Sequence, residues 1–192
     1  MAKDYDFQPD LDNSVDLDKL LLTQRQRFNL LRWALYGLLC IVGLLLQDTL
    51  LCRVNVQGGF VDLVPCLIFM ITALQGAEQG SVFALIAAIF YDCAGTAPGM
   101  YTIPVITALA VLVAIFRQAC LRRGCFSIAL CASLSVFVYE MVVFAVGLFM
   151  GQALPERFGC MLMTAALTML TVPVAYPFVR GIGKIGGETW KE

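Results

Sequence analysis

The sequence predicts an all-α integral membrane protein, a bundle of six transmembrane helices. The composition is the first observation: 60% of the 192 residues are hydrophobic and 14% are charged, whereas soluble domains carry about 25% charged residues. The second is that the apolar residues gather in six runs separated by short polar segments. These runs are typical of spans, because a helix that crosses a bilayer needs about 20 apolar residues.

The chain begins with an acidic segment. Its first 18 residues contain one lysine and six aspartates, unlike the basic start of a secretory signal peptide: Asp4, Asp6, Asp10, Asp12, Asp16 and Asp18. We predict that residues 1–31 form an acidic cytoplasmic tail, disordered to about Ser14 and followed by an amphipathic lead-in helix. Residues 32–180 then form the transmembrane bundle, and residues 181–192 a short cytoplasmic tail.

Six spans are predicted in the order of the apolar runs, at about 33–51, 60–74, 80–91, 100–116, 126–150 and 158–179. The second and third are too short to cross a bilayer comfortably if they are straight. This pair therefore forms either two thin spans or a hairpin that enters the membrane and returns. An even number of spans results in both cases.

The positions of lysine and arginine predict the orientation, because cytoplasmic loops are enriched in these residues. Only Arg53 and Arg157 fall on one side of the predicted bundle. The opposite side carries the residues that we interpret as cytoplasmic basic anchors: Arg25, Arg27, Arg32, Arg117, Arg122, Arg123, Arg180 and Lys184. Both termini are therefore predicted to lie in the cytoplasm.

Several function classes lack support in the composition. The chain has no histidine, which removes the usual general base and most zinc sites. Its eight cysteines form no C-x-x-C pair and are interpreted as small buried hydrophobic residues. No basic run resembles a nucleic-acid-binding patch. We therefore expect no enzyme activity, no cofactor, no metal site and no nucleic-acid partner.

Small residues recur at every fourth position through the third predicted span. The positions are Gly76, Gly80, Ala84, Ala88 and Asp92. Residues four apart share one face of a helix, and small side chains let a second helix approach closely in lipid. This small-residue ridge either packs inside the bundle or receives the transmembrane helix of a partner, and the sequence leaves both possibilities open.

Carboxylates fall at the ends of the predicted spans and inside one of them. Four lie toward the outer side, Asp48, Asp62, Asp92 and Glu140, whereas Glu78 lies in the inner turn between the second and third spans. The three aspartates are interpreted either as solvated helix ends or as part of a polar site. Glu140 is the deepest, so we expect it to face a polar cavity, pair with an arginine or be protonated. Tyrosines such as Tyr91 and Tyr139 are interpreted as packing or interface residues.

The region from Gly59 to Gly99 resembles the MreD family, a membrane component of the bacterial rod-shape system. The matching pieces are GGFVDLVP, ALQGAEQG and DCAGTAPG. The matching positions are Asp62, Gly76, Glu78, Gly80, Asp92, Gly95 and Gly99. Val61 departs from the proline frequent in that family, and Ala84 and Ala88 stand where glycines are common. The acidic N-terminal segment also lies outside the family pattern.

The resemblance implies a non-enzymatic scaffold in the cytoplasmic membrane of a bacterium. Such a scaffold helps to guide lateral peptidoglycan synthesis and to regulate cell shape. The implied partners are an MreC-like single-span protein and also RodA, a penicillin-binding transpeptidase and MreB. The implied mechanism is helix packing, in which the bundle docks the partner helix and presents basic residues to partners or to anionic lipid.

A second resemblance implies a different function. The glycine-spaced hairpin that ends in aspartate is also similar to the substrate-binding S component of energy-coupling-factor vitamin transporters, which have six spans and a similar fold. An S component binds a small molecule near the outer face, where the carboxylates of this chain gather. Against this alternative, the outer side offers few Trp, Asn, Gln and Arg residues for a vitamin pocket.

Overall fold

The structure is a computed structural model that describes residues 24–53, 58–120 and 125–184. Within these residues the chain is all-helical, with six α-helices and two short 3-10 turns. In chain order they are α2 (Gln24–Thr49), η1 (Leu51–Arg53), α3 (Leu63–Gln75), α4 (Ala77–Cys93), α5 (Thr102–Cys120), α6 (Cys125–Phe149), η2 (Pro155–Arg157) and α7 (Phe158–Gly183). Residues 1–23, which hold the predicted acidic tail and the first half of the predicted lead-in helix, and residues 185–192 of the predicted C-terminal tail lie outside the described residues.

Each apolar run that the sequence predicts as a span is helical in the structure. Three helical segments are long and apolar enough to cross a membrane: Arg27–Thr49, Ser127–Phe149 and Pro155–Gly183. Leu63–Gln75 and Thr102–Arg117 are apolar but shorter. The described part of the chain therefore has the helices of a membrane protein.

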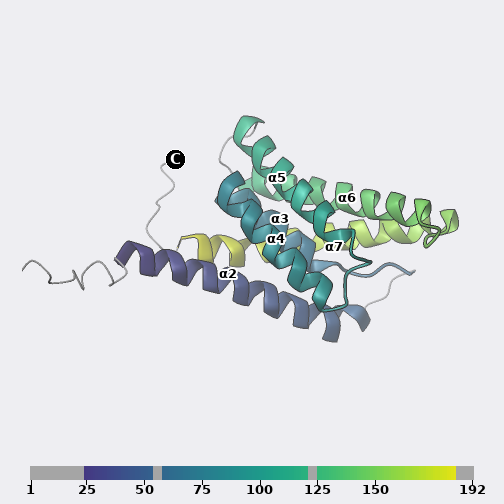
Figure 1. Ribbon diagram of the computed structural model, residues 1–192, viewed down its shortest axis with the longest axis horizontal. Helices are drawn as coiled ribbons and strands as arrows, with labels where there is room; N and C mark the ends of the chain where they lie inside the picture. Colours follow the sequence, from purple (N-terminus) through teal and green to yellow (C-terminus); the bar gives the residue numbers. More distant parts are fainter. Residues whose placement is uncertain (1–23, 54–57, 121–124, 185–192) are drawn as a thin grey trace, which may run out of the picture.

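Helix α3 forms the centre of the bundle. Every residue from Val64 to Leu74 is buried, and α3 contacts all five of the other described α-helices. α2 lies along one side of it, and α5 and α6 lie on the other side (Figure 1). A helix that is apolar all round is stable only when it is enclosed, so the uniform hydrophobicity of α3 explains its central place.

The outward faces of the surrounding helices are also apolar. Exposed side chains include Leu38 and Leu45 of α2, Phe90 of α4, Leu134 of α6 and Phe178 of α7. In the described part of the chain, apolar side chains thus face outward around an apolar centre. This distribution suits hydrocarbon as the surrounding medium.

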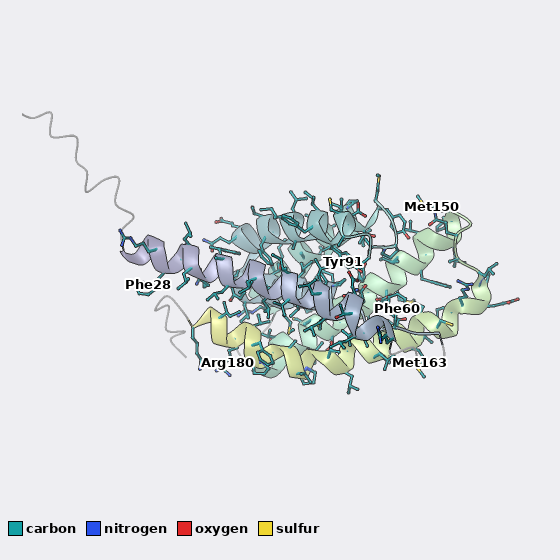
Figure 2. The ribbon with its side chains drawn as sticks, turned by 90° about the horizontal axis from the view of Figure 1, so that it is seen from below. Phe28, Phe60, Tyr91, Met150, Met163 and Arg180 are labelled. Carbon is teal, nitrogen blue, oxygen red and sulfur yellow. The ribbon has the colours of Figure 1, made fainter. Side chains whose placement is uncertain are left out.

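The helices run back and forth between two ends of the molecule. Figure 2 shows Phe28 of α2 and Arg180 of α7 at one end, called here the tail end, and Phe60, Tyr91 and Met150 toward the other, called the far end. α2 and α7 therefore run antiparallel. The described chain begins and finishes at the tail end.

The α3–α4 hairpin brings the small-residue ridge into the interior. Gly76 does not lie on the ridge helix as predicted but in the turn, where its φ of 91° is one that glycine adopts without strain. Gly80 packs so closely on α3 that an added Cβ would lie 2.8 Å from Thr72 Cγ2. Ala84 and Ala88 are fully buried. Of the two alternatives for the ridge, packing within this chain is the arrangement observed.

Arg117 lies inside α5 and is buried, which differs from the expectation of a basic residue in a cytoplasmic loop. Its guanidinium donates hydrogen bonds to the backbone oxygens of Ala73 and Leu74 at the C-terminal end of α3. Carbonyl groups in the last turn of a helix have no partner within that helix, and they attract positive charge. Arg117 therefore caps α3 from a neighbouring helix.

Replacing Arg117 with methionine is expected to lower the free energy of unfolding by about 1–3 kcal/mol, because buried carbonyl groups lose their donor. The matched control is Arg27→Met, which changes an exposed arginine of α2 and is expected to alter stability by less than about 0.5 kcal/mol. Denaturant unfolding of the purified chain in mixed micelles measures both. Equal losses in the two variants would contradict the capping role of Arg117.

Candidate functional site

The polar site of the bundle is centred on Asp62, which immediately precedes α3 and is 3% exposed. Two threonines of α7, four residues apart on one face of the helix, hold the backbone that leads into α3. The amide of Phe60 donates to Thr164 Oγ1 at 3.3 Å, and the amide of Asp62 donates to Thr168 Oγ1 at 3.0 Å. Side chains of another helix thus satisfy this non-helical backbone.

The Asp62 carboxylate accepts hydrogen bonds from two neutral side chains. Gln47 of α2 donates from Nε2 to Oδ1 at 2.9 Å, and Tyr91 of α4 donates its hydroxyl, 2.9 Å from both Oδ1 and Oδ2. Asp62 makes no capping bond to α3. Instead, the side-chain oxygen Oε1 of Gln47 accepts a hydrogen bond from the backbone N–H of Val64 at 3.1 Å. A side chain of α2 thus satisfies a backbone donor in the first turn of α3.

A second buried carboxylate belongs to the same region. Glu140 of α6 is 8% exposed and interacts electrostatically with Asp62. Its neighbour Tyr139 is 1% exposed, packs edge-on against Phe69 of α3, and interacts electrostatically with Asp62 and Glu140. We define Gln47, Asp62, Tyr91, Tyr139 and Glu140 as the carboxylate cluster. Tyr91 marks its place toward the far end in Figure 2.

Neutral side chains donate the hydrogen bonds that the Asp62 carboxylate accepts. Among the residues that the structure describes, no lysine or arginine donates a hydrogen bond to Asp62 or Glu140, and the donors to Asp62 are an amide and a hydroxyl. The expectation that Glu140 pairs with an arginine is therefore not met within the described part.

The remaining carboxylates predicted from the sequence are more exposed than those of the cluster. Asp48 at the end of α2 and Glu78 at the start of α4 are exposed, and Asp92 at the end of α4 is half-buried. Asp48 therefore occupies the solvated helix end that the sequence allows for it. Asp62 differs, because its carboxylate is enclosed by α2 and α4.

Gly95 and Gly99, two of the positions that match the MreD family pattern, lie in the connection between α4 and α5. Gly95 has a φ of 75°, and an added Cβ on Gly99 would lie 2.8 Å from Tyr101 Cε1. Both shape this connection and lie outside the ridge face of α4.

The predicted basic anchors divide between surface and interior. Arg27, Arg180 and Lys184 are exposed, whereas Arg32 is 8% exposed and donates from Nη2 to Asn29 Oδ1 at 2.7 Å. Arg117 caps α3 as described. The backbone of Arg25 belongs to α2, but the structure does not describe its side chain. Arg122 and Arg123 lie outside the described residues.

Sequence reasoning missed the neutral members of the site. Tyr91 and Tyr139 were interpreted as packing or interface residues, and Gln47, Thr164 and Thr168 were not singled out. Two signals were available: Gln47 interrupts the apolar run IVGLLLQDTL, and the two threonines share one face of an apolar helix. Polar side chains inside a span usually face the bundle interior, so these positions were identifiable as inward-facing.

In the described ranges, no group of three or more His, Cys, Asp or Glu residues is arranged to hold a metal ion. The cluster offers two carboxylates, three neutral polar side chains and no strong nucleophile. Comparison of the chain with protein-family models, with curated proteins and with solved structures finds no match.

Proposed function

We propose that this chain is a non-enzymatic, multi-pass scaffold of the bacterial cytoplasmic membrane, of the MreD type, that helps to guide lateral peptidoglycan synthesis and to regulate cell shape. One observation carries the proposal. The positions that match the family pattern are positions on which the α3–α4 hairpin depends: Asp62 enters α3 within a polar network, Gly76 forms the turn, and Gly80 permits close helix contact. Residues with these roles are typical of a sequence motif that specifies the fold of a membrane protein.

We propose that all six described α-helices cross the membrane. Helix α3 has 13 residues and so extends about 20 Å, shorter than the bilayer core of about 30 Å. The non-helical segment before it completes the crossing. Such backbone is tolerated at membrane depth only where protein satisfies it, and the bonds from Phe60 and Asp62 to the two threonines of α7 meet this requirement.

Both termini are proposed to lie in the cytoplasm. The described chain begins and finishes at the tail end, as an even number of spans requires (Figure 2). Arg27, Arg180 and Lys184 are exposed near the helix ends, and clusters of basic residues favour the cytoplasmic side. The far end, with the carboxylate cluster, then faces the outer side of the membrane.

The proposed partner is an MreC-like single-span protein, with RodA, a penicillin-binding transpeptidase and MreB as further members of the assembly. Because the small-residue ridge is filled by α3 of the same chain, the partner helix would dock on a different face. Association in lipid would still rely on close packing and polar contacts rather than on the hydrophobic effect.

Affinity purification of the tagged full chain from its native membranes in mild detergent tests this proposal. We expect an MreC-like protein, or RodA with its transpeptidase, to co-purify and to be absent from the eluate of an unrelated multi-pass protein carrying the same tag. A tagged Asp48→Asn variant, changed at an exposed position, should retain the partners. Failure to recover any of these proteins from membranes that contain them would contradict the scaffold function.

The S component of an energy-coupling-factor transporter remains the second candidate function. The observation that favours it is the buried carboxylate cluster toward the far end, since an S component binds its small-molecule substrate near the outer face. In the same purification, recovery of a transporter T subunit with two ATPases would support this candidate and overturn the scaffold.

A further inference from the structure

The helices that face outward differ in length from one part of the bundle to another. α2, α6 and α7 supply the three segments that are long enough to cross a membrane. α4 has 17 residues, and the apolar part of α5, Thr102–Arg117, extends only about 23 Å. These two shorter helices pack against each other, and Figure 1 shows α6 and α7 extending past them at the far end. We define the short face as the exposed apolar side chains of α4 and α5: Val82, Leu85, Ile86, Ile89, Phe90, Leu112, Ile115 and Phe116.

Two carboxylates limit the apolar length of α4. Glu78 in its first turn is exposed, and Asp92 in its last turn is half-buried. They lie about 21 Å apart along the helix axis, whereas the hydrocarbon core of a typical bilayer is about 30 Å thick. Because a carboxylate is costly in hydrocarbon, both side chains reach the membrane surface only where the bilayer is thinner than average.

The long helices do not have this limit. Arg157 just before α7 and Arg180 in its last turn are both exposed and lie about 35 Å apart along the axis. On α2 the corresponding stretch, from the exposed Arg27 to the exposed Asp48, is about 32 Å. These helices therefore match the core of an ordinary bilayer. The apolar belt of the protein is about 10 Å narrower at α4 than at α2 or α7.

The helices of the short face are fixed against the centre of the bundle. Gly80 of α4 contacts α3 so closely that an added Cβ would lie 2.8 Å from Thr72 Cγ2. Arg117 of α5 donates hydrogen bonds to backbone oxygens at the C-terminal end of α3. Because these contacts oppose sliding of α4 or α5 along α3, the lipid is the more adaptable side of this boundary.

We propose that the short face is covered by bilayer lipid, that it thins the bilayer locally, and that it favours phospholipids with short acyl chains. A span shorter than the hydrocarbon thickness is accommodated in part by thinning of the bilayer, at a cost that rises with each ångström of mismatch. Short-chain lipids lower this cost beside α4 but not beside α7. The proposal rests on the six-span topology proposed above and is independent of the identity of the partner.

Quenching of tryptophan fluorescence by brominated lipid tests the proposal in the full chain. The two native tryptophans, Trp33 and Trp190, are replaced with phenylalanine. One reporter is then introduced, either Ile86→Trp on the short face or Leu170→Trp on α7, at side chains that are 50% and 71% exposed. Each protein is reconstituted in vesicles of brominated 18-carbon phosphatidylcholine mixed with phosphatidylcholine of 14-carbon or 22-carbon monounsaturated chains. Relief of quenching measures how well each lipid displaces the brominated lipid at that position.

We expect the 14-carbon lipid to displace brominated lipid from the Ile86→Trp position at least about twofold better than the 22-carbon lipid does. At the Leu170→Trp position the 14-carbon lipid should have no advantage. Glu78→Leu lengthens the apolar stretch of α4, so it should reduce the preference for short chains at Ile86→Trp. Glu156→Leu, changed at an exposed carboxylate in η2, is the matched control and should leave that preference unchanged.

Three results would overturn the proposal. The first is the same chain-length preference at both reporter positions. The second is a preference at Ile86→Trp that Glu78→Leu leaves unchanged. The third is normal quenching at Leu170→Trp with none at Ile86→Trp, which would mean that protein covers the short face. Partner recovery is measured separately in the affinity purification, so this proposal and the scaffold function fail by different results.

Discussion

Replacing Gly80 with leucine is expected to destabilise the α3–α4 hairpin strongly. The ideal Cβ position lies 2.8 Å from Thr72 Cγ2 and 3.0 Å from Thr72 Cα, so the side chain would meet the backbone of the central helix. Overpacking a core costs about 1–3 kcal/mol and sometimes more. We expect a loss at or above the upper end, because a backbone does not move aside as a flexible side chain does.

The matched control for this change is Gly37→Leu. Gly37 also lies within a long apolar helix, but an added Cβ would meet nothing within 4 Å. Both variants are compared by denaturant unfolding in mixed micelles and by the fraction recovered as a monodisperse peak after extraction. Gly80→Leu should be extracted poorly or unfold early, and Gly37→Leu should behave as the native chain. Similar behaviour of the two variants would mean that the ridge does not hold α4 against α3.

Replacing Asp62 with alanine is expected to be the most damaging change in the carboxylate cluster. It removes the acceptor for the Gln47 amide and the Tyr91 hydroxyl, and both donors stay buried. Each buried donor left without a partner costs about 1–3 kcal/mol. The expected total for the two donors is about 2–6 kcal/mol, large against the free energy of unfolding of a typical domain, about 5–15 kcal/mol.

A double-mutant cycle tests whether this loss comes from the hydrogen bonds. Tyr91→Phe removes one donor to Asp62, so the losses of Asp62→Ala and Tyr91→Phe should not add, with a coupling energy of about 0.5–3 kcal/mol. Asp48→Ala, at an exposed carboxylate, serves as the control and should change stability by less than about 0.5 kcal/mol. Strict additivity, or an equal loss in Asp48→Ala, would contradict the network.

The helices of this chain were predictable because hydrophobicity follows local sequence. Each apolar run became a helix, with differences mainly at the ends. α2, for example, includes residues 24–32, which precede the predicted first span, because a helix can extend through polar residues beyond an apolar run. The same effect explains Arg117: it follows an apolar run, but α5 continues to Cys120 and carries the arginine into the interior.

The candidate site was predictable only in part, since its members come from distant parts of the chain. Asp62 bonds to Gln47, 15 residues away, to Tyr91, 29 residues away, and to Thr168, 106 residues away. Periodicity shows which residues share one face of one helix. It does not show which helices meet, so the sequence indicated that Asp62 and Glu140 lie toward one side but not that neutral side chains from α2, α4 and α7 enclose Asp62.

The support of α3 at both ends has a consequence for biosynthesis. The start of the helix depends on Gln47 of α2 and on Thr168 of α7, and its end depends on Arg117 of α5. Polar backbone groups left without partners are costly in hydrocarbon, so in the proposed membrane topology α3 depends on these other helices. We therefore expect α3 to reach its native surroundings only after α7 has been synthesised.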